Sequence, residues 1–250
     1  MEHCGYFGKR PLERDFVFDG LAAGMTDVWA GLMSDWLASV QTTLPATWKK
    51  LYFEGPAWRF AIGPGLIGGT AWCGLLSASV DAVGRSFPLA ALMQTGGPVR
   101  RLLFDRSAEK ALDSLELQLM AFIEAQITRK QFLSAIAEHG NSLVRLQEGI
   151  PSTSRLEPDA GERALRVSFA RTDGEAILAD DAMSLRGPQA ASPDLPLSYW
   201  WQDGGTARPP ELCVWKGLPR GEGTGGFFSG EWRTFGWKRG QIDPDRILRP

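Results

Sequence analysis

The sequence predicts an α/β fold built around a central β-hairpin, and three observations lead to this prediction. Trp58, Phe60 and Ile62 alternate with smaller or polar residues, the two-residue period of a strand that has one face on a core. The run 71–76 is apolar on both faces, which is typical of a strand covered on each side. The stretch 21–44 carries apolar residues at three- and four-residue steps, which indicates a helix packed against the sheet.

The other elements of the first half follow from similar patterns. Pro45 ends the first helix, because proline cannot continue a helical hydrogen-bond ladder. The glycine-rich stretch 63–69 is expected to reverse the chain between the two hairpin strands, since glycine tolerates the positive φ of tight turns. Further expected elements are two extended pieces at 5–11 and 15–18, a short helix at 48–53, and a third apolar strand that begins at Phe87.

Two helices are expected in the middle of the chain. In the first, Leu112, Leu115, Leu119 and Phe122 line one face, while Leu117, Met120 and Ile123 widen it, as in a helix wedged between other elements. The pair Thr128 and Gln131 has the spacing of a capping box, so a second helix begins there. His139-Gly140 is a typical C-terminal stop for that helix.

The chain is expected to form a single domain over residues 1–250. A segment rich in Pro, Ser, Glu and Gly, 147–162, is the best candidate for a linker between an N-terminal core, 1–146, and C-terminal strands and loops, 163–250. Strand-like runs follow it at 165–169, 197–201 and 212–215. Because this last part has few helical patterns to bury its strands, we expect it to extend the sheet of the first part.

Composition narrows the classes of function. With 44% hydrophobic and 22% charged residues the chain is typical of a soluble globular protein, and a net charge of −2 argues against a nucleic-acid partner. No apolar run approaches the roughly 20 residues of a membrane helix, and no signal peptide is evident, so a cytoplasmic protein without membrane insertion is expected. Ten Trp and thirteen Phe fit either a densely packed core or a docking protein.

Motifs for catalysis, cofactors or metals are weak or absent, so none of the three is expected. Two GxGxxG matches begin at Gly63 and Gly221, but a dinucleotide site needs a helix directly after the glycines. The first match runs into a strand, and the second is interpreted as a flexible loop. The two histidines stand at a terminus, His3, and at an expected helix end, His139. Cys4, Cys73 and Cys213 lack the spacing of a disulfide framework or a thiolate metal site.

The loop 79–89 is the candidate functional site. It places Asp81 and Arg85 at the margin of the central hairpin, where loops held by a rigid sheet often carry binding residues. Two interpretations are open: Arg85 binds a partner, or the two residues only pair and pin the loop. Gly84-Arg85-Ser86-Phe87-Pro88 also resembles a nucleophile elbow, except that Pro88 replaces the closing glycine.

A longer series of residues resembles the TagF family of type VI secretion accessory proteins. The similarity spans most of the chain and is more specific than any short motif. It is carried by Gly5-Tyr6-Phe7-Gly8-Lys9, Pro11, Asp15-Phe16-Val17, Asp35-Trp36-Leu37, Trp48, Tyr52, Pro56-Ala57-Trp58-Arg59-Phe60, Ser79-Val80-Asp81, Val83-Gly84-Arg85, Phe87-Pro88-Leu89, Ser198, Trp200-Trp201, Gly204 and Gly217-Leu218-Pro219.

This resemblance implies a three-layer α/β/α sandwich with a central mixed sheet and a cytoplasmic, non-enzymatic protein. It also implies post-translational repression of the type VI secretion system through protein–protein interaction with its forkhead-associated scaffold protein. Our candidate interaction or loop residues are Asp15, Asp81, Arg85, Ser86, Phe87 and Pro88. Arg14 and Ala78-Ser79 depart from the family pattern, so the shape of the early turn is left open.

The alternative function is an enzyme, or a nucleotide- or small-molecule-binding protein. In that case Asp81, Arg85 and Ser86 would line a pocket at the edge of the sheet.

Overall fold

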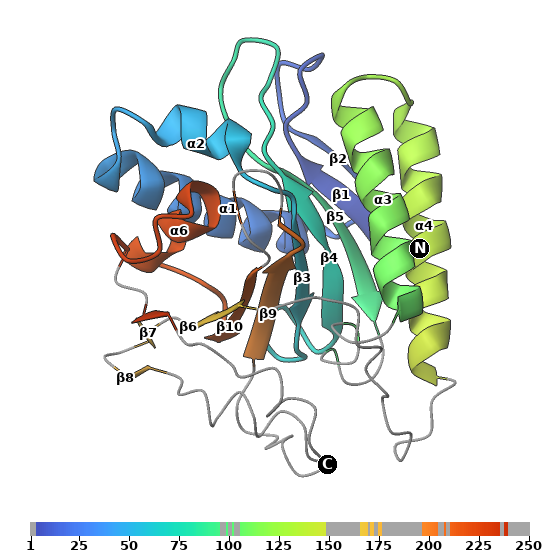
Figure 1. Ribbon diagram of the computed structural model, residues 1–250. Helices are drawn as coiled ribbons and strands as arrows, with labels where there is room; N and C mark the ends of the chain where they lie inside the picture. Colours follow the sequence, from blue (N-terminus) through green and yellow to red (C-terminus); the bar gives the residue numbers. More distant parts are fainter. Residues whose placement is uncertain are drawn as a thin grey trace.

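The core of the fold is a mixed sheet of nine strands (Figure 1). The computed structural model describes residues 4–95, 99, 102, 106–148, 166–169, 171–172, 175–176, 197–204, 208, 211–235 and 238–239. Their strands are β1 (Cys4–Gly8), β2 (Val17–Asp19), β3 (Trp58–Ile62), β4 (Ala71–Ser77), β5 (Leu89–Thr95), β6 (Arg166–Phe169), β9 (Leu197–Gln202), β10 (Glu211–Lys216) and β11 (Lys238–Arg239), with a separate ribbon of β7 (Arg171–Thr172) and β8 (Glu175–Ala176).

The strand order is β11-β6-β10-β9-β3-β4-β5-β1-β2, so the predicted hairpin β3–β4 lies at the centre of the sheet. All neighbours in it pair antiparallel except β10 and β6, which pair parallel. Trp58 faces Leu76 across the hairpin, and Arg59 faces Trp201 where β3 pairs with β9. The strands predicted after residue 163 therefore extend the same sheet as the N-terminal ones.

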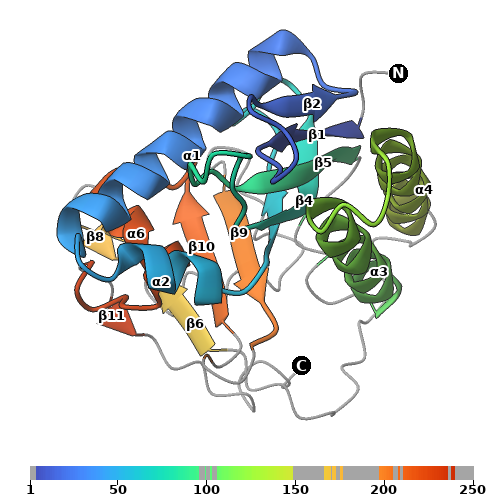
Figure 2. The same cartoon turned by 90° about the horizontal axis from the view of Figure 1, so that it is seen from above.

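In the described part of the chain, the helices on one face of the sheet are α1 (Ala23–Thr43), α2 (Trp48–Glu54) and α6 (Gly225–Ser229) (Figure 2). Alternate side chains of β3, Trp58, Phe60 and Ile62, are buried in the same core as the apolar stripe of α1. The core is unusually rich in aromatic rings, and Trp36 stacks on Phe227 with ring centroids 4.1 Å apart. The tryptophan excess thus serves packing on this face.

The described helices on the opposite face are α3 (Arg106–Ile123) and α4 (Arg129–Glu148). Phe122 and Phe132 stack with centroids 4.4 Å apart and join the two helices. The predicted capping box is confirmed, since the Gln131 backbone N–H donates to Thr128 Oγ1 and the Thr128 N–H donates to Gln131 Oε1. The helix pair and the sheet share one apolar core.

The predicted end of this second helix at His139-Gly140 is wrong, because α4 continues to Glu148. Gly140 lies where the helix approaches β5, and a Cβ there would lie 3.2 Å from Cγ of Met93. The glycine therefore permits close packing of helix on strand rather than ending the helix. Residues 149–162 of the expected linker lie outside the described residues, and Gln147 is helical.

The interpretation of 221–226 as a flexible loop is also wrong. These residues form a short 3-10 turn, Glu222–Thr224, followed by the buried helix α6. A Cβ on Gly225 would lie 2.2 Å from the Phe235 ring, and one on Gly226 would lie 2.3 Å from the Trp232 ring. The glycines let aromatic rings pack directly on the helix backbone.

The wide apolar face predicted for α3 is only partly buried. Leu112, Leu115, Leu119 and Phe122 pack in the core as expected, but Leu117 is 70% exposed and Met120 is 38% exposed. The predicted α/β class is confirmed by strands and helices that share their cores. The three-layer assignment and the single-domain division stay predictions.

Candidate functional site

The loop between β4 and β5 is a small ordered hairpin. Val80 and Ser86 form an isolated antiparallel bridge, and the Asp81 N–H donates to the Arg85 carbonyl oxygen at 3.1 Å. Gly84 closes the turn with φ +83°, a left-handed conformation that favours glycine. The intact Gly84-Arg85 of the sequence pattern therefore has a structural reason.

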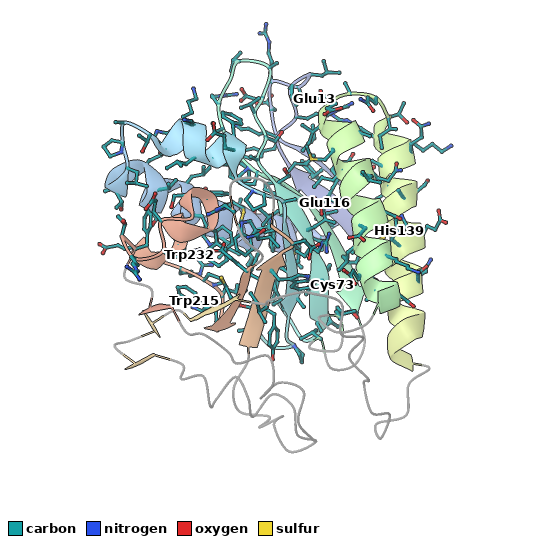
Figure 3. The ribbon with its side chains drawn as sticks, in the orientation of Figure 1. Glu13, Cys73, Glu116, His139, Trp215 and Trp232 are labelled. Atoms are coloured by element: carbon teal, nitrogen blue, oxygen red, sulfur yellow. The ribbon has the colours of Figure 1, made fainter. Side chains whose placement is uncertain are left out.

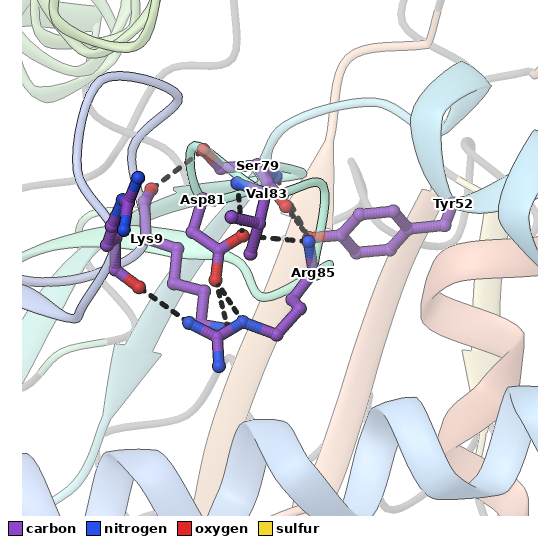
Figure 4. A network of polar contacts seen from close by, with 7 residues as sticks. Lys9, Tyr52, Ser79, Asp81, Val83 and Arg85 are labelled. Carbon is purple, nitrogen blue, oxygen red and sulfur yellow. Dashed lines mark hydrogen bonds and ion pairs between the residues drawn. The ribbon is translucent and has the colours of Figure 1, made fainter.

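The Asp81 carboxylate is the centre of this loop (Figure 4). Its Oδ1 accepts hydrogen bonds from the backbone N–H groups of Val83 and Arg85, at 3.1 and 2.9 Å. Its Oδ2 accepts from Lys9 Nζ at 2.9 Å and from Arg85 Nε at 2.5 Å. Asp81 is only 2% exposed, although it lies in a loop at the margin of the hairpin. One buried carboxylate thus orders both sides of the turn.

Two opposing effects act on the pKa of Asp81. Burial favours the neutral acid and raises the pKa, but hydrogen bonds from the Arg85 backbone and from the Lys9 and Arg85 side chains favour the carboxylate. The hydrogen bonds outweigh desolvation and hold the pKa of Asp81 well below its usual range. The group is therefore ionised at neutral pH and poorly suited to act as a general acid.

A buried tyrosine fixes the base of the loop. Tyr52 of α2 donates its hydroxyl hydrogen to the Ser79 carbonyl oxygen and accepts from the Ser79 N–H, both at 2.9 Å. Ser79 Oγ in turn donates to the Lys9 carbonyl oxygen at 2.7 Å. Burial raises the pKa of Tyr52, which keeps the hydroxyl neutral and able to donate. The N–H, the carbonyl and the hydroxyl of Ser79 are thus all used in the network.

A second loop, residues 9–16, packs against the first. The Ala82 N–H donates to the Glu13 carbonyl oxygen at 2.8 Å, and Arg85 Nη2 donates to the Arg14 carbonyl oxygen at 2.6 Å. The Phe16 ring lies edge-on to the Phe87 ring, with centroids 4.8 Å apart. The early turn and the central loop therefore form one continuous surface at this end of the sheet.

The predicted pair of Asp81 and Arg85 exists, but Arg85 also reaches beyond it. Its side chain is 60% exposed, and its Nη1 has no hydrogen-bond partner among the described residues. A guanidinium held by two hydrogen bonds presents its remaining donors in a fixed direction. The arrangement can pin the loop and still offer donors to an acceptor on another molecule.

The other candidate residues divide between core and surface. Phe87 and Pro88 are buried, and a Cβ on Gly8 would lie 2.2 Å from the Pro88 carbonyl oxygen, which shows how closely the two loops approach. Ser86 Oγ is buried and has no hydrogen-bond partner in the described part of the chain, so no base is in contact with it. Asp15 is exposed in the second loop.

Among the described residues, neither a histidine nor a metal-binding cluster lies at this loop. His139 lies on α4, away from the loop that carries Glu13 (Figure 3), and His3 lies outside the described residues. His139 helps to line an open groove of about 370 Å³ between α3 and α4. Within the described ranges no cluster of three or more His, Cys, Asp or Glu could hold a metal ion. In the same ranges no helix has the length and apolar character needed to cross a membrane.

Sequence reasoning missed Lys9 and Tyr52 as members of this site. Both lie in the series that resembles the family, but they are 72 and 29 positions from Asp81, and no local pattern connects residues so far apart. The signal that could have found Lys9 is its charge, because a lysine directly after an apolar strand end needs a partner once it is buried.

Comparison with known proteins places this chain in a family. Residues 5–139 match the TagF N-terminal domain, described as type VI secretion system-associated. The fold is similar to the crystal structure of PA0076 from Pseudomonas aeruginosa PAO1, with a TM-score of 0.63, 25% sequence identity, and coverage of 96% of this chain and 97% of that one. No curated protein matches the chain. Because the matching domain spans more than half of the sequence, this chain belongs to the TagF family of type VI secretion system-associated proteins.

Proposed function

We propose that this protein is a non-enzymatic regulator of the type VI secretion system. It represses assembly or firing of the machine after translation, by binding the forkhead-associated scaffold protein in the cytoplasm. Membership of the TagF family supports the link to secretion. Helices on both faces of the mixed sheet support the further proposal of a three-layer α/β/α sandwich.

The observation that carries this proposal is the division of roles between Asp81 and Arg85. The Asp81 carboxylate accepts four hydrogen bonds inside the protein and is not offered to a substrate. Arg85 stays exposed, and its Nη1 has no hydrogen-bond partner among the residues that the structure describes. The buried carboxylate orders the loop, and the outward guanidinium is available to a partner. This combination suits a docking site, because arginine is enriched among the residues that dominate binding energy at interfaces.

The alternative, an enzyme or small-molecule-binding protein that uses Asp81, Arg85 and Ser86, has less support. The buried Ser86 hydroxyl has no base in contact with it within the described residues, and the pKa of Asp81 is held low. A screen against phosphopeptides and generic esters with added divalent metals tests this alternative. Turnover that Ser86→Ala abolishes would establish the alternative and overturn our proposal.

Binding and repression can be tested on the same variant. The purified protein should bind the purified scaffold protein of its own secretion cluster, and its overproduction should reduce secretion. Arg85→Ala should weaken binding by about 30-fold, the equivalent of about 2 kcal/mol for an interface arginine. It should lower the free energy of unfolding by only about 0–1 kcal/mol, as for a partly exposed pair. Wild-type affinity and repression in Arg85→Ala would place the docking surface elsewhere.

A further inference from the structure

The two loops at the end of the sheet carry exposed apolar side chains. Leu12 is 65% exposed, Val83 is 62% exposed and Phe16 is 42% exposed. Phe16 is held in place by stacking on Phe7, with centroids 5.1 Å apart, and by Lys9 Nζ, which lies 5.3 Å from the centroid of the Phe16 ring. The Phe16 side chain therefore occupies a fixed position although solvent reaches it.

We name Leu12, Arg14, Phe16, Val83 and Arg85 the loop-end surface. Its loops are pre-organised, because Asp81 and Tyr52 hold them from beneath. A surface that is already ordered loses less conformational entropy when a partner binds. Exposed apolar side chains beside outward guanidinium groups are typical of the anchors of protein interfaces.

The loop-end surface carries surplus positive charge. Lys9 and Arg85 share the single carboxylate of Asp81. The Arg14 side chain is exposed and makes no hydrogen bond or ion pair with other described residues, and it is engaged only through its backbone carbonyl. Asp15 is exposed nearby and offsets one charge. Together the two loops hold four cations, Lys9, Arg10, Arg14 and Arg85, against three carboxylates, Glu13, Asp15 and Asp81, which leaves a net charge of +1.

A second exposed apolar area has the opposite charge. On α3, Leu117 and Met120 lie beside Asp113 and Glu116, and these two carboxylates converge with Asp203 on one guanidinium, that of Arg59. Three carboxylates on a single cation leave a surplus negative charge on this face. The loop-end surface therefore favours an acidic partner, and the α3 face favours a basic one.

We propose that the loop-end surface binds an acidic segment of the partner, with a carboxylate beside Arg14 and Arg85 and an apolar side chain against Leu12, Phe16 and Val83. The identity of this partner as the forkhead-associated scaffold protein rests on the proposed function. The proposal adds which surface is used, and the charge and apolar character of the segment that it takes. The α3 face repels such a segment, because its own carboxylates are in excess.

The test is a titration of the purified scaffold protein with variants of this chain. Arg14→Glu reverses a charge without removing any hydrogen bond of the Asp81 network, since Arg14 contributes only its carbonyl. Val83→Asp places a carboxylate on the apolar part of the same surface. Both should weaken binding at least tenfold with an unchanged melting temperature. Leu117→Asp, an equally exposed leucine on α3, is the matched control and should bind as wild type.

Ionic strength gives an independent readout. Binding to the wild type should weaken as salt rises from 50 to about 300 mM, because the interaction is between opposite charges, and the salt dependence should be shallower in Arg14→Glu. If the wild type binds the scaffold and only Leu117→Asp reduces the affinity, the choice of surface is overturned. The proposed function stays intact in that case. No binding by the wild type would overturn the proposed function itself, and with it the occupant named here.

A second copy of this chain is the competing occupant, since its acidic α3 face is complementary to the loop-end surface. Such a contact joins two different patches, so repeated contacts build rings or open chains of several copies. Light scattering over a range of protein concentrations detects it. Mass that grows with concentration, and that Arg14→Glu and Leu117→Asp both abolish, would overturn the proposal in favour of self-association.

Discussion

Replacing Tyr52 by phenylalanine isolates the contribution of the network beneath the loop. The change removes only the hydroxyl, which makes two hydrogen bonds of 2.9 Å to the backbone of Ser79, and both residues are buried. Each bond contributes about 0.5–1.5 kcal/mol net, and the buried Ser79 N–H and carbonyl lose their hydroxyl partner. We expect the free energy of unfolding to fall by about 2 kcal/mol, or about 4–8 °C in melting temperature for a chain of this size.

Tyr6 is the matched control for this substitution. It is as completely buried as Tyr52, but its hydroxyl has no hydrogen-bond partner in the described part of the chain. Tyr6→Phe should therefore leave stability unchanged or raise it slightly. Denaturant unfolding followed by tryptophan fluorescence measures both variants on the same scale. An equal loss in both, or a Tyr52→Phe protein within about 0.5 kcal/mol of wild type, would refute the reasoning.

Three further predictions concern the space around two glycines, the pH dependence of stability and the reactivity of two buried cysteines. Gly74→Ala should cost about 3 kcal/mol or more, because its Cβ would lie 2.0 Å from a carbonyl oxygen of β5, whereas Gly69→Ala, with open space around it, should be tolerated; chemical denaturation compares the two. The Asp81 carboxylate stabilises the fold fully above its unfolded pKa of about 3.9, and this contribution is lost as pH falls through its lower folded pKa. Asp81→Asn should therefore make the free energy of unfolding depend less steeply on pH in the acid range. Burial raises the pKa of Cys73 to about 12 and that of Cys213 well above its ordinary value, so both thiols should react with a disulfide reagent at pH 8 only after unfolding.

Sequence patterns predicted elements well where the signal was local and periodic. The central hairpin, the capping box and the apolar stripe of α1 all follow from spacings within a few turns of chain. The patterns failed at glycines, because Gly140 permits close packing against Met93 of β5 and Gly226 permits close packing against the Trp232 ring. A glycine at a helix end and a glycine under an aromatic ring are identical in sequence, and only the tertiary neighbour separates them.

The sequence predicted the candidate site only in part, because only its short-range contacts have a local signal. Asp81 and Arg85 are four residues apart, so their pairing could be anticipated. The burial of Asp81 could not be anticipated, because it depends on Lys9 and on loop 9–16. Only the pairing of β1 with β5 brings these residues beside Asp81. The exposed Leu117 was missed because periodicity identifies an apolar face but does not say whether another element covers it.

The aromatic core on the α1 face has a consequence for how the gene can be divided. The indole N–H groups of Trp36 and Trp58 donate to the carbonyl oxygens of Pro219 and Phe227, so the matched N-terminal region holds the C-terminal backbone directly. The match ends at residue 139, inside α4, and β3 on one side of that boundary pairs with β9 on the other. A recombination breakpoint there would remove β9, one of the two neighbours of β3, and would expose tryptophan side chains at the new edge of the sheet. The matched region and the rest of the chain are therefore expected to be inherited together, as one heritable unit.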